Sequence, residues 1–294
     1  MMSVSGKTPD AADLRRLARF RLNGKRNEIV TGLVSGSRIL EVRNQWRALL
    51  ESWAKGEQAE DLTGRIFEVT EGHFAIPAGD AARGILCVGM NYRLHQAEVD
   101  DALGAYEKKK PVIFSKLSES LVGAEDPLSL SSEPSREFDW EVELGVVIGR
   151  AGRHVAAAEA FSHVSGYTLV NDVTARDAQR AHSQWFLGKN VHRTTPVGPY
   201  LIHRDALGWP PDGRLQLSVN GEVKQDSSTL DMVHGVAQLI ATISTYVELQ
   251  PGDIIATGSP PGVGFTRKPP QFLVKGDVIR AELVGFMTMR NEVQ

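Results

Sequence analysis

Branched apolar residues alternate with other residues along many short stretches of the chain, and this period of two predicts a protein built mainly from β-strands. The clearest stretch spans residues 138–149. Because alternate side chains of a strand share a face, every second residue from Val142 to Ile148 fills one side of the predicted strand. The other side carries Glu141 and Glu143, so a core-facing surface is combined with two neighbouring carboxylates.

Two like charges on one strand face repel each other unless a partner neutralises them. A divalent cation coordinated by carboxylate oxygens would do so. The alternative is an edge strand whose Glu141 and Glu143 face the solvent, where exposed charges cost little. The strand alone leaves both interpretations open, and the rest of the chain has to distinguish them.

Helical and turn patterns complete the outline of the fold. Apolar residues at helical spacing predict helices over residues 42–53 and 232–246, and residues 93–104 fit a further short helix. The Asn220-Gly221 pair between two alternating stretches predicts a β-hairpin. These elements indicate an α+β fold that is mostly β.

The chain divides into two predicted parts. Residues 1–12 are predicted to be a disordered lead, and the remainder of residues 1–82 is expected to form a small N-terminal α/β appendage with few chemically useful side chains. Residues 83–294 are expected to form the catalytic domain. This division places every candidate for chemistry in the second part.

Composition excludes several classes of protein. The chain has 294 residues, 41% hydrophobic and 23% charged, and its net charge of −3 shows no bias toward nucleic acid. The single cysteine, Cys87, rules out an intrachain disulfide and a cysteine-cluster metal site. No apolar stretch reaches the length of a membrane span, and the polar N-terminus lacks a signal-peptide core. We therefore expect a cytoplasmic protein that binds neither nucleic acid nor membrane.

Four polar residues outside the strand stand where they could carry chemistry. His95 and Glu98 are three apart on the predicted helix, so they form either a histidine base oriented by a carboxylate or an ordinary exposed pair. Asp172 ends a predicted strand and is either a third oxygen ligand or the N-cap of the next helix. Lys189 follows an aromatic and apolar run, where it would either face a developing anion or lie at the surface.

Six motifs then coincide in order. They are Val88-Gly89-Met90-Asn91-Tyr92 with His95 and Glu98, Phe114-Ser115-Lys116, Glu141-Val142-Glu143-Leu144-Gly145, Asn171-Asp172-Val173-Thr174-Ala175-Arg176-Asp177, Phe186-Leu187-Gly188-Lys189, and Thr257-Gly258-Ser259-Pro260 with Gly262-Val263-Gly264. In this order and approximate spacing they resemble the fumarylacetoacetate hydrolase family, over about residues 85–293. Each motif alone is a weak signal, but six together favour the metal-site interpretation of the two glutamates.

The resemblance implies a rolled, mixed β-sheet catalytic domain with short flanking helices, often dimeric, in an acylpyruvate hydrolase-like protein of bacterial type. It implies that Glu141, Glu143 and Asp172 bind a metal ion, and three carboxylates suit Mg²⁺, or Mn²⁺ or Ca²⁺ in its place. The catalytic residues that it implies are His95, Glu98, Lys189 and Lys116, and the substrate-facing residues are Arg176, Gln179, Tyr92 and Thr257. Ser259 and residues 190–193 depart from the pattern of many relatives, which affects substrate choice more than the metal site.

These residues favour a metal-dependent hydrolase that cleaves a carbon–carbon bond of a small 2,4-diketo acid of the acylpyruvate type, giving pyruvate and a carboxylic acid. His95, oriented by Glu98, would deprotonate water, and Lys189 with Lys116 would stabilise the oxyanion. The same metal site would also suit an oxaloacetate-type decarboxylase or an isomerase of an unsaturated keto acid. A non-catalytic keto-acid binder would need no base, so the histidine dyad argues against it.

Overall fold

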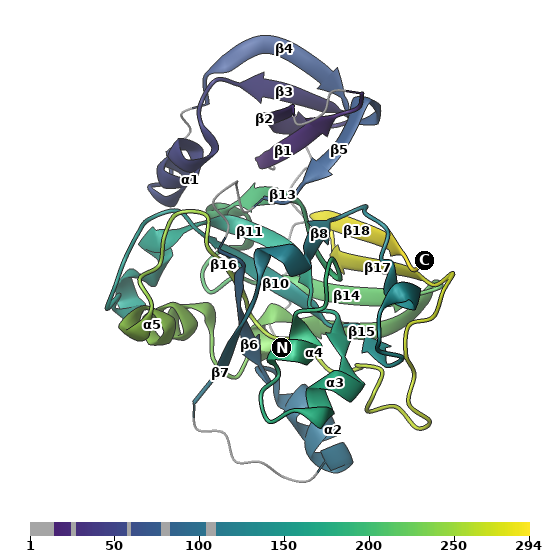
Figure 1. Ribbon diagram of the computed structural model, residues 1–294. Coiled ribbons are helices and arrows are strands. Elements are labelled where there is room, and N and C mark those ends of the chain that lie inside the picture. Colours follow the sequence, from purple (N-terminus) through teal and green to yellow (C-terminus); the bar gives the residue numbers. More distant parts are fainter. Residues whose placement is uncertain (1–14, 25–27, 58–59, 78–82, 104–109) are drawn as a thin grey trace, which may run out of the picture.

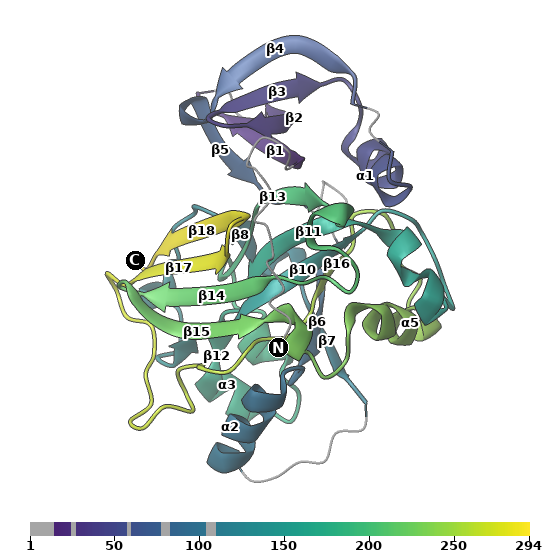
Figure 2. The same cartoon turned by 180° about the vertical axis from the view of Figure 1, so that it is seen from behind.

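A computed structural model describes residues 15–24, 28–57, 60–77, 83–103 and 110–294 (Figures 1 and 2). The predicted disordered lead lies outside the described residues, and so does the stretch 78–82 at the predicted domain boundary. Strands dominate the described part and its helices are short, which confirms the mostly β, α+β fold class. None of these helices is both long and apolar enough to cross a membrane.

A 12-stranded mixed sheet organises the chain. Its path runs through β4 (Leu62–Glu68), β3 (Arg38–Val42), β2 (Ile29–Ser35), β1 (Arg16–Leu22), β13 (Thr195–His203), β11 (Val164–Asn171), β10 (Val142–Ile148), β16 (Ile254–Ala256), β6 (Ile85–Gly89) and β7 (Val112–Lys116). Two further strands, β5 (Gly72–Ala75) and β8 (Leu121–Gly123), pair with β1 and β13.

The remaining strands form two small sheets. One has the order β15 (Glu222–Ser228), β14 (Arg214–Val219), β17 (Val278–Leu283) and β18 (Met287–Glu292), and the other pairs β9 (Phe138–Asp139) with β12 (Thr174–Ala175). The α-helices are α1 (Trp46–Ala54), α2 (Arg93–Leu103), α3 (Arg176–Ala181), α4 (Phe186–Lys189) and α5 (Val236–Tyr246).

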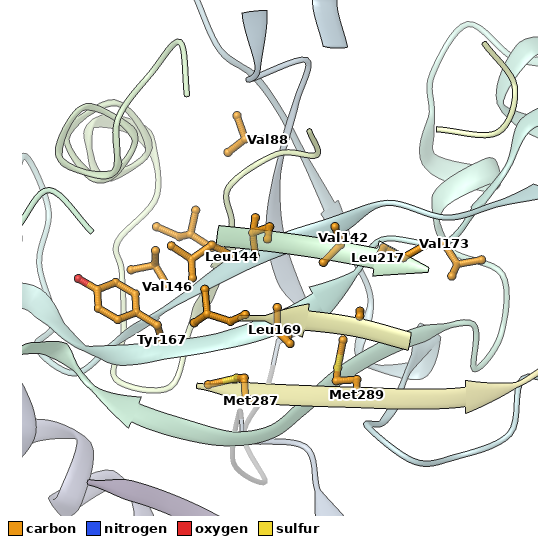
Figure 3. Close-up of a cluster of buried hydrophobic side chains, with 14 of the residues drawn as sticks. Val88, Val142, Leu144, Val146, Tyr167, Leu169, Val173, Leu217, Met287 and Met289 are labelled. Carbon is orange, nitrogen blue, oxygen red and sulfur yellow. The ribbon is translucent and has the colours of Figure 1, made fainter. Parts of the chain in front are cut away.

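β10 lies in the middle of the large sheet, between β11 and β16, and all of its residues are buried. Figure 3 shows the core on its apolar side, where Leu144 belongs to the same cluster as Tyr167 of β11 and Met289 of β18. The four-stranded sheet thus packs on this face of β10 and gives the domain its rolled form (Figure 2). A central strand buried on both faces cannot be a solvent-facing edge strand, so that interpretation of the two glutamates is wrong.

The opposite face of the large sheet has its own core. Val147 of β10 packs there with residues of α1 such as Leu50 and Trp53. Glu143 lies four residues before Val147 and therefore points to the same side. On this face of β10, apolar residues therefore pack against α1, and the carboxylate of Glu143 lies further along the strand.

The predicted strand over residues 138–149 is interrupted in the structure. Trp140 and Glu141 separate β9 from β10 because their backbone N–H groups donate to side-chain oxygens of Asp139 and Asn171, at 2.8 and 3.0 Å, rather than to a neighbouring strand. The break lets β9 pair with β12 while β10 stays in the large sheet. Glu141 therefore sits at the bend between two sheets.

The predicted hairpin is present in the structure, whereas the predicted helix over residues 232–246 is shorter than expected. The hairpin at Asn220-Gly221 is confirmed, and both residues have positive φ angles, 53° and 81°. The helix predicted over residues 232–246 begins only at Val236, because the backbone N–H groups of the preceding residues 233–234 donate to Asn91. Asn91 thereby connects the strand end that precedes α2 to the start of α5.

The large sheet continues across the predicted division between residues 82 and 83. β1 pairs antiparallel with β13, in the register Arg16 with Ile202 and Leu17 with Leu201. The strands β1 to β4 form the upper lobe of Figure 1, above the main body of the molecule. The N-terminal part therefore extends the catalytic sheet, and its status as a separate domain stays a prediction.

Candidate metal centre and active-site pocket

Three carboxylates meet where β10 begins and β11 ends. The antiparallel register pairs Val142 with Asn171, which places Glu141 opposite Asp172 and puts Glu143 two residues along on the same face. All three side chains are buried, and one oxygen from each lies within 4.8 Å of the other two. The structure therefore brings together the three predicted metal ligands.

Both predicted catalytic lysines donate to this carboxylate cluster. Lys116 Nζ lies 2.6 Å from Asp172 Oδ1 and also donates to a backbone carbonyl. Lys189 Nζ lies 2.6 Å from Asp172 Oδ2 and 2.8 Å from Glu141 Oε2. Asp172 is thus fixed by two ammonium groups and is not the N-cap of α3, which is Ala175.

Arg176 connects the metal cluster to the wall of the pocket. Its Nε donates to Asp139 at 2.9 Å, its Nη2 to Glu141, and its Nη1 to Gln179 at 3.0 Å. Asp139 is fully buried and also accepts the backbone N–H groups of residues 264–265, at 2.6 and 3.1 Å. Asp139 therefore positions both Arg176 and the glycine loop, a role that the sequence analysis did not identify.

The electrostatics of the cluster differ from one carboxylate to the next. Burial alone would raise the pKa of Glu141, but Arg176 and Lys189 hold it well below its ordinary value. For Glu143, burial and the neighbouring carboxylates of Asp172 and Glu141 raise the pKa well above its ordinary value. Glu143 is therefore the member of the cluster whose negative charge lacks sufficient compensation from the protein.

The donor set of the cluster fits a hard divalent cation. Four buried carboxylates, those of Asp139, Glu141, Glu143 and Asp172, face three buried cationic side chains here, so the fully ionised cluster carries excess negative charge. The group of possible ligands consists of carboxylates alone among the described residues, and carboxylate oxygens are the donors that Mg²⁺, Mn²⁺ and Ca²⁺ prefer. The triad can therefore bind a divalent metal ion.

The raised pKa of Glu143 predicts that metal binding depends on pH. Below that pKa the carboxyl group keeps its proton in the metal-free protein, and the cation has to displace the proton in order to bind. The apparent affinity should therefore increase with pH, by up to about tenfold per pH unit, until the pH passes the raised pKa. Calorimetric titration with Mg²⁺ in two buffers of different ionisation enthalpy would measure the released proton. A pH-independent affinity without proton release would contradict the assignment.

A pocket of about 220 Å³ opens next to the cluster. Its polar lining includes Glu141, Arg176, Lys189 and His95, and Glu141 brings the carboxylate triad to the pocket surface. The pocket volume is adequate for a small organic acid. Glu143 and Asp172 are more deeply buried, at 1% and 0% exposure.

The predicted dyad is formed on α2 at the edge of this pocket. His95 Nδ1 lies 2.6 Å from Glu98 Oε1, and the histidine side chain is buried rather than exposed. Glu98 also accepts the backbone N–H of Gly262 at 3.0 Å. The carboxylate thus orients the imidazole and joins α2 to the loop after β16, so the ordinary exposed pair is not what the structure contains.

Four predicted residues lie in different places relative to the pocket. Gln179 lines it, whereas Lys116, Tyr92 and Thr257 do not. Tyr92 belongs to the main hydrophobic core, and Thr257 Oγ1 donates to the carbonyl of Leu144 at 2.9 Å. This geometry gives Lys116 a positioning role through Asp172 and offers no direct substrate contact for Tyr92 or Thr257.

The pocket also contains residues that the sequence analysis did not single out as substrate contacts. Its apolar walls include Met90, Val99, Trp185 and Phe265, and its rim includes Arg180. Trp185 contains no catalytic group and so gave no sequence signal. Arg180 does have a sequence signal, because a cationic side chain immediately after Gln179, a predicted substrate residue, predicts a contact with an anionic substrate.

The family follows from comparison with known proteins. A family model described as "Fumarylacetoacetate (FAA) hydrolase C-terminal" matches residues 84–294. The chain belongs to the fumarylacetoacetate hydrolase family. The family that the six motifs indicated is thereby confirmed, and the match begins close to the predicted start of the catalytic domain.

Among the members of this family, the chain is similar to proteins named oxaloacetate tautomerases. The chain is 37% identical to oxaloacetate tautomerase YisK of Bacillus subtilis over 244 residues, which cover 83% of this chain and 80% of YisK. It is 44% identical to the mitochondrial oxaloacetate tautomerase Fahd2a of Rattus norvegicus over 210 residues, 71% of this chain and 66% of that protein. The match thus spans slightly under two thirds of the rat protein's length.

Solved structures support the fold. The structure of a fumarylacetoacetate hydrolase from Exiguobacterium antarcticum superposes with a TM-score of 0.79 at 33% identity and covers 95% of this chain and 99% of that chain. The agreement includes residues before the range of the family model. The N-terminal lobe is therefore part of an arrangement shared with that protein.

Proposed function

We propose that this protein is a metal-dependent tautomerase that interconverts the keto and enol forms of a small 2-keto dicarboxylic acid such as oxaloacetate. The observation that carries the proposal is the pair of buried His95 and half-buried Glu98, 2.6 Å apart, at a pocket that Glu141 of the carboxylate triad also lines. A keto–enol interconversion requires a proton to be moved at a fixed position, which a paired histidine can do in both directions. The two oxaloacetate tautomerases among the relatives support the same reaction class.

His95 is the residue that would move the proton. Glu98 engages Nδ1, so Nε2 is the ring nitrogen available to the substrate. In the ketonising direction the imidazolium would donate a proton to C3 while the enol hydroxyl releases its proton to solvent, so the total number of protons is unchanged. In the reverse direction the neutral imidazole would remove the proton from C3 while the 2-keto oxygen takes one up from solvent. Glu98 keeps the ring in one orientation in either case.

The triad of Glu141, Glu143 and Asp172 would hold the cation, for which we propose Mg²⁺, with Mn²⁺ or Ca²⁺ as substitutes. When bound, the cation supplies Lewis-acid polarisation of the 2-keto oxygen. Lys189 stays protonated, because Asp172 and Glu141 raise its pKa despite its burial. Its ammonium can therefore donate a hydrogen bond to an oxygen that becomes negative at this end of the pocket.

The distal carboxylate of the substrate needs a second cationic partner, and Arg180 at the rim of the pocket can be that partner. Within the described part of the chain its side chain pairs with Glu137 alone, and this ion pair is partly exposed, with 46% and 30% of the two side chains accessible. An exposed ion pair contributes little free energy, so exchanging it for a substrate carboxylate costs little. Arg176, by contrast, is occupied by Asp139, Glu141 and Gln179.

Replacing Arg180 with glutamine is therefore expected to raise the KM for oxaloacetate by about tenfold to 100-fold, the effect of losing one charge-assisted hydrogen bond. Tautomerisation of phenylpyruvate, which lacks the second carboxylate, should change little. Steady-state kinetics with both acids measure the ratio. Arg136→Gln, a nearby exposed arginine outside the pocket, is the control. Equal losses on both substrates would refute selection of the dicarboxylate by Arg180.

Carbon–carbon hydrolysis of an acylpyruvate is the second candidate, since His95 held by Glu98 could also activate water. The relatives support tautomerisation more than hydrolysis. Three assays on one Mg²⁺-loaded preparation separate the candidates: loss of the oxaloacetate enol, release of carbon dioxide from oxaloacetate, and release of pyruvate from acylpyruvates. We expect the first reaction to be fastest. If pyruvate release from an acylpyruvate is faster, the protein is a hydrolase and the tautomerase proposal is wrong.

The homodimer and the cytoplasmic location stay predictions.

A further inference from the structure

A second cleft lies far from the His95 dyad, between the N-terminal lobe and the main body. It has a volume of about 310 Å³ and is bounded by β1 and β5 on one side and by β8 and the segment around Arg193 on the other. Figures 1 and 2 both show β5 descending from the upper lobe toward β13 and β8. The polar residues of its lining are Arg19, Arg21, His73, Ser118, Asp126 and Arg193.

The cleft concentrates positive charge. Arg19 and Arg21 are two residues apart on β1, so they project from the same face of the strand toward the cleft. Arg193 adds a third guanidinium from the main body. Asp126 is the one acidic side chain in the lining among the residues that the structure describes. Among the described residues of the lining, three guanidinium groups thus accompany one carboxylate.

Asp126 does not neutralise Arg21 of β1. Asp126 Oδ2 accepts the backbone N–H of Gly123 at 3.0 Å and Arg193 Nη2 at 3.2 Å. Arg21 is partly buried, and its guanidinium group makes no hydrogen bond or ion pair with any described residue. Arg19, by contrast, is engaged within the protein: it is 7% exposed and donates to the carbonyl of Ile76 at 3.3 Å, among other interactions. Placing the guanidinium group of Arg21 in a partly desolvated cleft is unfavourable unless an anion compensates its charge.

We propose that this cleft binds a small polyanion, a metabolite that carries two or three carboxylate or phosphate charges. The planar guanidinium groups of Arg21 and Arg193, from opposite walls, would each donate to the anion in the paired geometry that carboxylates and phosphates accept. The hydroxyl of Ser118 and the ring of His73 supply further hydrogen-bond partners in the same lining. The proposal is independent of the reaction at the other pocket.

The wall of the cleft is formed by the segments that follow Lys116 and Lys189, the two lysines that bind the carboxylate cluster. Ser118 begins the short 3₁₀ helix Ser118–Ser120, two residues after Lys116. The backbone N–H of Arg193 donates to the carbonyl of Glu119 at 3.0 Å, and Leu117 N–H donates to Asn190 Oδ1 at 2.6 Å. The two segments that carry Lys116 and Lys189 are therefore hydrogen-bonded to each other at the wall of the cleft. An anion bound there would fix the backbone that follows both lysines.

The test is calorimetric titration of the full, Mg²⁺-loaded chain with two probes, inorganic phosphate and tricarballylate, which separate a phosphate ligand from a carboxylate ligand. We expect at least one probe to bind the native protein. Arg21→Gln should weaken that binding by about tenfold, the effect of losing one charge-assisted hydrogen bond, and Arg193→Gln should do the same. Arg38→Gln removes an exposed arginine of the same lobe outside the cleft, and should leave the affinity unchanged.

Arg21→Lys keeps the charge but loses the paired guanidinium geometry, so its affinity should lie between those of Arg21→Gln and the native protein, which distinguishes a lost contact from a damaged lobe. The proposal is overturned if neither probe binds the native protein. It is equally overturned if Arg21→Gln and Arg193→Gln bind as the native protein does, or if Arg38→Gln loses as much affinity as they do.

Discussion

Replacing Glu143 with glutamine is expected to remove tight binding of the divalent cation and to lower turnover by about 100-fold or more, since even residues that only support a metal ligand commonly contribute ten- to 100-fold. Glutamine keeps the shape of the side chain and an oxygen that can still accept the Gly258 N–H, which donates at 2.8 Å. It removes the charge that burial and the neighbouring carboxylates disfavour. The metal-free variant should therefore be at least as stable as the native chain.

Calorimetric titration with Mg²⁺, steady-state kinetics and urea unfolding would be measured on the same preparation. Glu222→Gln, which changes an exposed glutamate of the hairpin paired with Lys224, is the matched control and should behave as the native protein. Native metal affinity in Glu143→Gln would show that the buried triad is not the metal site.

Replacing His95 with alanine is expected to lower turnover by about 10²- to 10⁴-fold, the usual contribution of a general acid or base, while leaving Mg²⁺ affinity nearly unchanged. The reason is that His95 lines the pocket but is not one of the three clustered ligands. His182→Ala, which removes an exposed histidine of the same region, should retain activity.

The outcome of His95→Ala shows whether His95 acts as the base or belongs to the metal ligands. Loss of metal binding in this variant would mean that the histidine belongs to the metal site. Unchanged turnover with unchanged metal binding would mean that another group moves the proton.

Much of the site could be predicted from the sequence because its residues follow local rules. The period of two on β10 puts Glu141 and Glu143 on one side, and the spacing of three on α2 puts His95 beside Glu98. The approach of Asp172 to Glu141, however, depends on the register of β10 and β11, which no local pattern specifies. Only the ordered motifs of the family supplied that contact before the structure did.

Other features could not be predicted because they depend on tertiary contacts. Asp139 is a positioning residue only because the chain bends between β9 and β10 and brings it under Arg176. The start of α5 is delayed by hydrogen bonds from Asn91, which is far away in the sequence. The cleft of Arg21 and Arg193 joins two lobes whose packing no periodicity describes. Such contacts are long-range, and residue patterns report mainly on neighbours along the chain.

The most direct test of the proposed function follows the ultraviolet absorption of the oxaloacetate enol after the protein has been stripped of metal with EDTA and then reloaded with Mg²⁺. Mg²⁺ without protein and metal-free protein provide the two background rates. The proposed tautomerase should accelerate ketonisation well above both backgrounds when protein and Mg²⁺ are present together, and EDTA should reverse the effect. A rate no greater than that of Mg²⁺ alone, or full activity in EDTA, would contradict metal-dependent tautomerisation at this site.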